Sequence, residues 1–158
     1  AVIDKGFIDK DELYVTGGSG GGVLTAWIVG HTDRFKAAVV AKPVINWYSF
    51  VLTADMYNFF YQYWFPGLPW ENMEHYMKYS PISYVGNVTT PTMLLTGEND
   101  YRTPMSETEQ YYQALKLKGV DTAMVRIQDS GHGIYARPSN LMNKVAYILH
   151  WFEKYRDE

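Results

Sequence analysis

A serine set among glycines is the first candidate for chemistry. Ser19 lies within the run Gly17–Gly22, between the apolar stretch "LYVT" (residues 13–16) and the helical pattern "GGVLTAWIVGH" (residues 21–31). Residues 17–21 fit the pattern G-x-S-x-G, in which a sharp strand-to-helix turn exposes a nucleophilic serine hydroxyl. Glycine at the two outer positions would avoid collisions with neighbouring backbone, and the Gly20 N–H would point at a developing oxyanion.

Other interpretations of the glycine run fit less well. A flexible linker joins polar flanks, whereas apolar sequence lies on both sides of this run. A P-loop needs a Lys after its last glycine, and none follows. The dinucleotide pattern G-x-G-x-x-G would need glycine at Val23 or at Ser19, depending on where it starts. A nest of backbone N–H groups that binds an anion stays open.

A nucleophilic serine needs a base and an acid that orients this base. In a strand-turn-helix setting the three follow in the order Ser, Asp or Glu, His. Asp100 follows the apolar run "TMLLTG" (92–97), and His132 follows "AMVRI" (123–127) within the glycine-flanked stretch "QDSGHGI". Ligand-facing groups collect at the carboxyl ends of parallel strands. We therefore expect Ser19, Asp100 and His132 to meet at one edge of a sheet.

Each of these roles has competing candidates. Asp100 could be only a turn or cap residue, as Asp often is in such loops. Glu98 is the second choice for the acid, whereas Asp129 lies too close to His132 in the sequence to be a separate strand-end partner. Three other histidines compete for the role of the base. His150 falls in a helical pattern, His31 follows a helix end, and His75 lies in an aromatic segment.

Four short apolar runs predict the strands that position these residues. They are residues 13–16, 37–41, 92–97 and 123–127. None alternates apolar with polar residues, which is typical of strands buried on both faces of a parallel sheet. Helical patterns follow at residues 21–31, 106–119 and 139–158, with Ser106 as a predicted N-cap and Gly119 as a predicted end. The alternation predicts an α/β fold of about four parallel strands with helices on both faces.

The stretch from Asn46 to Ser80 differs from the rest of the chain. It is dense in aromatic residues, as in "NWYSFVLTADMYNFFYQYWFPGLPW", and it is too long for a simple connection. We expect an insertion at about residues 46–80 that carries its own helices over one end of the sheet. Its aromatic side chains could line a pocket for an apolar ligand or simply fill a core.

Composition bounds the remaining possibilities. The chain has 158 residues, of which 47% are hydrophobic and 20% charged, as in one globular domain, here residues 1–158. The net charge is −3 with scattered Lys and Arg, so we expect neither nucleic acid nor a membrane among the partners. The absence of cysteine removes thiol catalysis and Cys-type zinc sites, and we expect no metal or cofactor. The compartment, cytoplasmic or periplasmic, is left open.

Three segments carry a family resemblance. "VTGGSGGG", "LLTGENDYRTP" and "SGHG" resemble the carboxyl-terminal catalytic domain of the prolyl oligopeptidase family of serine peptidases, and above all its acylaminoacyl-peptidase-like bacterial branch. The resemblance spans nearly the whole chain and implies the carboxyl-terminal half of an α/β-hydrolase fold. It implies Ser19 as nucleophile, His132 as general base and then acid, and Asp100 as the group that orients the imidazole. It also implies that the Gly20 N–H forms half of the oxyanion hole.

The resemblance further implies an apolar pocket for the first substrate side chain. The residues at matching positions are Val44, Trp47, Phe50 and Thr103. Family members carry a second oxyanion donor, often a tyrosine hydroxyl, and a β-propeller ahead of this segment, and this sequence contains neither. We therefore expect a partial catalytic domain from a serine peptidase that cleaves short peptides through an acyl-enzyme, with little activity in these 158 residues alone.

Two alternatives to a peptidase stay open. One is an esterase or other acyl hydrolase on the same fold, since such a triad serves esters and amides alike. The other is a hydrolase-like interaction module without catalysis.

The first predicted strand also raises an expectation about assembly. If residues 13–16 lie at a sheet edge, their unpaired N–H and C=O groups can recruit another chain. No Pro or inward charge interrupts this strand. We therefore expect a homo-oligomer, most simply a two-fold dimer with the two edges antiparallel. The alternative is that the first residues, "AVIDKGFI", cover the edge.

Overall fold

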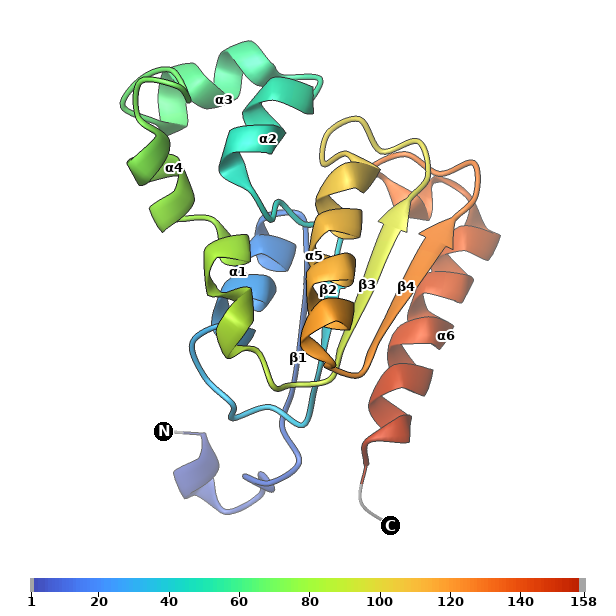
Figure 1. Ribbon diagram of the computed structural model, residues 1–158. Coiled ribbons are helices and arrows are strands. Elements are labelled where there is room, and N and C mark those ends of the chain that lie inside the picture. Colours follow the sequence, from blue (N-terminus) through green and yellow to red (C-terminus); the bar gives the residue numbers. More distant parts are fainter. Residues whose placement is uncertain (1, 157–158) are drawn as a thin grey trace.

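Four parallel strands form one sheet in the order β1-β2-β3-β4. The computed structural model describes residues 2–156 (Figure 1). The strands are β1 (Tyr14–Gly18), β2 (Ala37–Ala41), β3 (Thr92–Gly97) and β4 (Thr122–Ile127). Every residue of β2 and β3 is buried, which explains their unbroken apolar sequences. Gly18 pairs with Ala41, and Gly97 with Ile127, so the loops that follow the strands leave from the same edge.

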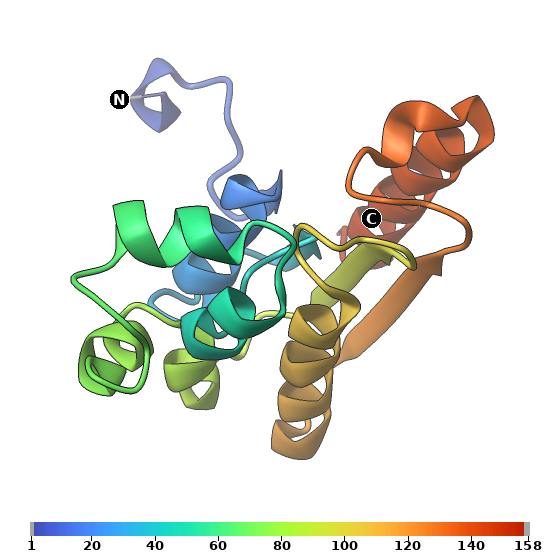
Figure 2. The same ribbon diagram turned by 90° about the horizontal axis from the view of Figure 1, so that it is seen from above.

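Helices cover both faces of this sheet, as the sequence predicts. Helices α1 (Gly20–Val29) and α5 (Met105–Lys118) pack on one face, and α6 (Pro138–Lys154) packs on the other (Figure 2). Val40 and Leu94 belong to the core with α1 and α5, whereas Val39 and Met93 contact Trp151 of α6. Successive residues of one strand therefore pack into the cores on opposite faces of the sheet.

Helix boundaries differ in detail from the sequence prediction. Helix α1 spans Gly20–Val29, so it begins one residue before and ends two residues before the helical pattern predicted at residues 21–31. The prediction that Ser106 caps α5 is wrong, because Pro104 occupies the N-cap and its carbonyl accepts a hydrogen bond from the Glu107 N–H. Gly119 ends α5 as predicted, with a left-handed φ of 79°.

The aromatic insertion forms three short helices above the carboxyl ends of the strands (Figure 1). They are α2 (Trp47–Thr53), α3 (Tyr57–Trp64) and α4 (Met73–Lys78). A 3-10 helix, Pro81–Asn87, then leads to β3, and two shorter ones occupy Ile3–Lys5 and Ile134–Ala136. Phe50, Phe60 and Tyr76 form a core of the insertion's own.

Glu107 of α5 joins this insertion to the sheet. Its buried carboxylate accepts hydrogen bonds from the backbone N–H groups of Ile45 (2.9 Å) and Asn46 (2.8 Å) and from the Ser49 hydroxyl. Asn46 in turn caps α2 through its side chain. Burial raises the pKa of Glu107, although its hydrogen bonds act in the opposite direction. One carboxylate thus fixes where the insertion leaves the sheet.

We predict that Glu107→Ala destabilises the protein by about 2–4 kcal/mol, because it leaves the N–H groups of Ile45 and Asn46 without their acceptor. Glu107→Gln keeps an oxygen at this place and should cost clearly less. Urea unfolding of both variants measures the difference. Equal losses for the two variants would contradict the assigned role of the acceptor oxygen.

Strand β1 has one neighbour, β2, among the described residues. The segment before it lies beneath the sheet rather than along the strand (Figure 1), and Phe7 is 70% exposed. Tyr14 of β1 contacts Phe152 of α6, with ring centroids 5.0 Å apart. Helix α6 also carries exposed apolar side chains, namely Leu141, Met142, Val145 and Leu149. Among the described residues, the edge of β1 that faces away from β2 therefore lies near helix α6, which carries these exposed apolar side chains.

We propose that the 158-residue chain on its own self-associates through this region, with two β1 edges antiparallel. Light scattering should show a mass that rises with concentration towards a dimer. Leu149→Lys, on the exposed side of α6, should weaken the association without unfolding the chain. A mass of one chain at every concentration would refute the proposal.

Candidate active site

Ser19 lies at the sharp turn between β1 and α1. Its φ of 59° and ψ of −120° are strained for a residue with a side chain. The Ser19 N–H donates to the carbonyl of Ala41 (3.1 Å), and the Ser19 carbonyl accepts from the Val23 N–H (3.0 Å). These bonds at the end of β2 and in the first turn of α1 hold the strained turn, so the hydroxyl projects from the sheet edge.

Two glycines of the run are required by close backbone approach. A Cβ on Gly17 would lie 2.3 Å from the carbonyl oxygen of Gly21, and one on Gly22 would lie 2.4 Å from that of Ala41. A Cβ on Gly21 would meet no atom within 4 Å. The expectation of a clash at Gly17 is confirmed, but the one at Gly21 is wrong. The second crowded position is Gly22, because the first turn of α1 packs directly on the end of β2.

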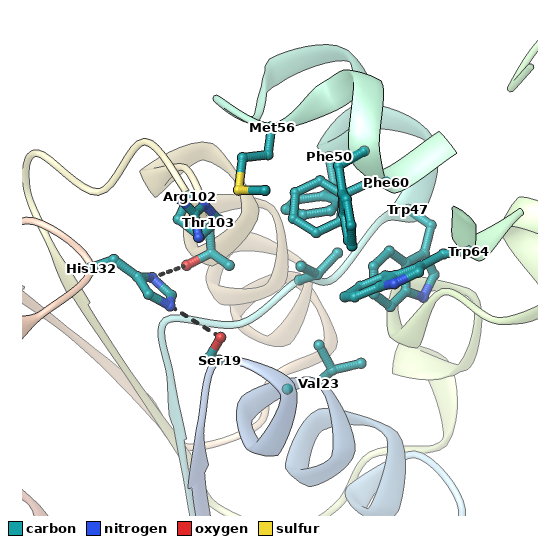
Figure 3. A pocket seen from close by; sticks show the side chains of 13 residues that line it. Ser19, Val23, Trp47, Phe50, Met56, Phe60, Trp64, Arg102, Thr103 and His132 are labelled. Carbon is teal, nitrogen blue, oxygen red and sulfur yellow. Dashed lines mark hydrogen bonds between the residues drawn. The ribbon is translucent and has the colours of Figure 1, made fainter. Parts of the chain in front are cut away.

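The structure brings the three predicted residues together. The Nε2 of His132 lies 3.0 Å from the Ser19 Oγ, and the Nδ1 of His132 lies 2.8 Å from the Asp100 Oδ2. Figure 3 shows the imidazole between the serine and the loop that follows β3. This geometry lets the imidazole exchange a proton with the hydroxyl while the carboxylate fixes its orientation.

Asp100 is buried and fully hydrogen-bonded. Its Oδ1 accepts from the N–H groups of Arg102 (3.0 Å) and Thr103 (2.9 Å), and its Oδ2 accepts from the Thr103 hydroxyl (3.1 Å) as well as from His132. Burial raises the pKa of Asp100, but the hydrogen bonds from His132 and Thr103 outweigh burial, and the pKa lies below its ordinary value. The carboxylate therefore stays ionised at neutral pH.

The loop that carries His132 is held on two sides. The Asn99 N–H donates to the Ser130 carbonyl (2.9 Å), and a Cβ on Gly97 would lie only 2.3 Å from that same oxygen. On the other side, the Lys42 Nζ donates to the carbonyl of His132 (2.7 Å). The loops after β2, β3 and β4 therefore support one another.

The competing candidates lie outside this arrangement. Glu98 is exposed, and the exposed Asp129 pairs with Arg137 at 3.5 Å. The ring of His31 contacts the carbonyl of Trp27 at 2.7 Å. His75 contacts Phe65 and Tyr79 in the insertion, and His150 is exposed on α6; these residues are not hydrogen-bonded to Ser19.

A cavity of about 260 Å³ opens beside Ser19 (Figure 3). Val44, Trp47, Phe50 and Thr103, the four residues matched by resemblance, all line it. The lining residues that sequence reasoning missed are Val23, Met56, Phe59, Phe60, Trp64 and Arg102. The spacing of Met56, Phe59 and Phe60 along one helical face was the available signal, because residues three and four apart share a face.

Arg102 is the one cation among these lining residues. Its Nε donates to the Asp55 Oδ1 (2.7 Å), and the Asp55 N–H donates to the Tyr101 carbonyl (2.9 Å). These two bonds tie the Asp100 loop to the insertion between α2 and α3. Arg102, which lines the cavity, and the loop of the buried Asp100 are therefore both hydrogen-bonded to the insertion.

Two features are absent from the part of the chain that the structure describes, namely a metal-binding cluster and a membrane-spanning helix. Within residues 2–156, no three His, Asp or Glu side chains are grouped so that they could hold a metal ion. No helix in this part combines the length and apolarity needed to cross a membrane.

Comparisons with known proteins find similarity along the whole chain. A sequence model described as "Prolyl oligopeptidase family" matches residues 1–158. The chain is 39% identical over 150 residues to YuxL, a peptidase of Bacillus subtilis (strain 168). This match covers 94% of the chain and 23% of YuxL. It is 35% identical over 161 residues to the acylamino-acid-releasing enzyme of Arabidopsis thaliana, covering 97% of this chain and 21% of the enzyme.

A solved structure of a similar protein has the same fold as this chain. The acylaminoacyl peptidase of Pyrococcus horikoshii superposes with a TM-score of 0.88 at 29% identity, over 93% of this chain and 24% of that one. The α/β-hydrolase fold expected from the sequence is thereby confirmed. The chain spans between a fifth and a quarter of the length of these relatives.

The crowded glycine gives a test of the turn geometry. We predict that Gly22→Ala destabilises the protein by about 1–3 kcal/mol, because the added methyl group must displace the Ala41 carbonyl or α1. Gly21→Ala is the matched control, and it should keep or slightly raise stability, since a helical alanine has open space there. Urea midpoints for the two variants measure this, and a Gly22→Ala midpoint at or above that of Gly21→Ala would contradict the packing.

Proposed function

The chain belongs to the prolyl oligopeptidase family, and on that premise we propose that it carries the catalytic serine, base and acid of a serine peptidase. The carrying observation is the pair of hydrogen bonds that links Ser19 to His132 (3.0 Å) and His132 to Asp100 (2.8 Å). The left-handed backbone of Ser19 supports it, since strain of this kind persists where a reactive group must be exposed.

In the first half of the proposed reaction, the Ser19 Oγ attacks the carbonyl carbon of the scissile peptide bond, and its proton passes to the Nε2 of His132. The Nδ1–H of His132 donates to Asp100, which stabilises the imidazolium. The substrate oxygen becomes an oxyanion. The Gly20 N–H donates to it, because the first N–H groups of a helix have no intrahelical acceptor.

The tetrahedral intermediate then collapses. The carbon–nitrogen bond breaks, the Nε2 proton passes to the departing amine, and the acyl group stays on Ser19. In the second half a water molecule gives its proton to the same Nε2 while its oxygen attacks the acyl carbon. The bond to the Ser19 Oγ breaks, the serine regains the proton, and the second product leaves as a carboxylic acid.

The cavity beside Ser19 supports a preference at the residue before the scissile bond. Trp47, Phe50 and Phe60 line it with aromatic side chains, and Val44 adds a branched aliphatic one. An apolar or aromatic side chain would be desolvated there at little polar cost. We therefore propose short peptides with such a residue as substrates.

We predict that Ser19→Ala, made in the natural full-length protein that contains this chain, lowers kcat for a peptide substrate by at least about 10³-fold, because no other group replaces the nucleophile. Ser106→Ala, at an exposed serine of α5, is the control and should leave kcat unchanged. Labelling by a fluorophosphonate should follow the same pattern.

Retained turnover in Ser19→Ala would refute the nucleophile. Hydrolysis of esters without hydrolysis of any peptide would refute the peptidase while leaving an acyl hydrolase.

A further inference from the structure

Lys42 is a charged residue beside the site that the proposed reaction does not use. It directly follows β2, and its side chain is half-buried. Its Nζ donates to the backbone carbonyl of His132 at 2.7 Å. The bond joins two residues 90 positions apart in the chain, and it reaches the same residue whose ring lies between Ser19 and Asp100.

The backbone of Lys42 is strained. Its φ is 40°, in the left-handed region, and Pro43 follows it. Its N–H donates to the Leu95 carbonyl (2.7 Å), so the strand ladder holds this conformation. Glycine would adopt such a φ at far lower cost. A lysine that persists in a conformation suited to glycine indicates that its side chain has a use.

Room for this side chain comes from the glycine turn. A Cβ on Gly18 would lie 3.2 Å from the Cε of Lys42, closer than an ordinary contact. The residue before Ser19 is therefore small where the lysine stem passes. The Lys42 side chain thus supplies a reason for glycine at position 18 that the nucleophile turn alone does not give.

Within residues 2–156, no close ion pair holds the charge of Lys42 in place. Burial and the neighbouring Lys144 both lower the pKa of Lys42, and Asp100 acts in the opposite direction. The direct partner of the ammonium is a carbonyl rather than a carboxylate. A half-buried cation of this kind adds little stability by itself, which favours a role in positioning.

We propose that Lys42 is a positioning residue that fixes the backbone of His132, so that the imidazole Nε2 stays within hydrogen-bond distance of the Ser19 Oγ. Asp100 holds the ring through Nδ1, and the Asn99 N–H holds the loop at Ser130. Lys42 supplies the remaining support, at the peptide carbonyl of His132 itself. The inference rests on the proposed function, since it assigns to Lys42 the positioning of His132, the proposed general base.

The test uses the natural full-length protein with four variants: Lys42→Met, Lys42→Gly, Lys42→Arg and Lys144→Met. Each is measured for kcat and KM on a peptide substrate, for the rate at which a small fluorophosphonate labels Ser19, and for its urea midpoint. The label has no side chain that fills the apolar cavity, so its rate reports the Ser19–His132 pair rather than substrate binding.

We expect Lys42→Met to lower kcat and the labelling rate by about 10–100-fold, because small misplacements of a base have effects of this size. KM should change by less than about twofold, since Lys42 is not among the lining residues of the cavity. Lys42→Gly should lose as much activity yet unfold at no lower urea concentration than Lys42→Met, because glycine relieves the backbone strain. Lys42→Arg keeps a donor and should recover part of the loss.

Lys144→Met tests whether the hydrogen bond from Lys42 to His132 or the positive charge near the site is responsible for the effect. Lys144 is the neighbouring cation, and within residues 2–156 it makes no hydrogen bond to the His132 loop. We expect its rates to stay within about twofold of wild type. An equal loss in Lys144→Met would overturn the proposal in favour of a field effect, and an unchanged labelling rate in Lys42→Met would overturn it outright. If the wild-type protein does not react with the label at all, the proposed function fails and this inference falls with it.

Discussion

The packing of the first turn of α1 on the end of β2 is the constraint on which the site depends. One carbonyl, that of Ala41, accepts the Ser19 N–H and lies where a Cβ on Gly22 would be. The turn between β1 and α1 must therefore be sharp, and Ser19 takes its left-handed φ from it. A wider turn would relieve the strain, but it would move the hydroxyl away from His132, because the helix could no longer begin at Gly20.

The other loops at this edge are held in the same way, by close backbone packing and hydrogen bonds between neighbouring loops. Gly97 lets the loop of His132 approach β3, and the Asn99 N–H donates to that loop. The insertion is attached by Glu107 on one side and by the pair of Asp55 and Arg102 on the other. Because each loop is hydrogen-bonded to a neighbouring loop, the positions of Ser19, Asp100 and His132 depend on the register of the parallel strands.

The sequence predicts the parts that depend on burial and order along the chain. Strands β2 and β3 are buried on both faces, so their apolar runs stand out, and Asp100 and His132 follow strands as loop residues of this fold do. Apart from the meeting of Ser19, Asp100 and His132 at one edge of the sheet, it does not predict contacts between distant segments. Gly22 is crowded by Ala41, and Lys42 reaches His132, only once the strands are paired. The cap at Ser106 failed for a local reason, since the carbonyl of Pro104 already accepts the first helical hydrogen bond.

Thr103 lies where the apolar cavity and the polar triad meet. It lines the cavity, while its N–H and hydroxyl both donate to Asp100 and its hydroxyl lies 3.3 Å from the Nδ1 of His132. A substrate side chain in the cavity would therefore exclude water from the side of the acid and base that Thr103 covers. Hydrogen bonds between charged groups strengthen when water leaves. In the proposed reaction, binding of an apolar side chain thus reinforces the bond from His132 to Asp100, and the selectivity of the cavity is coupled to the strength of the base.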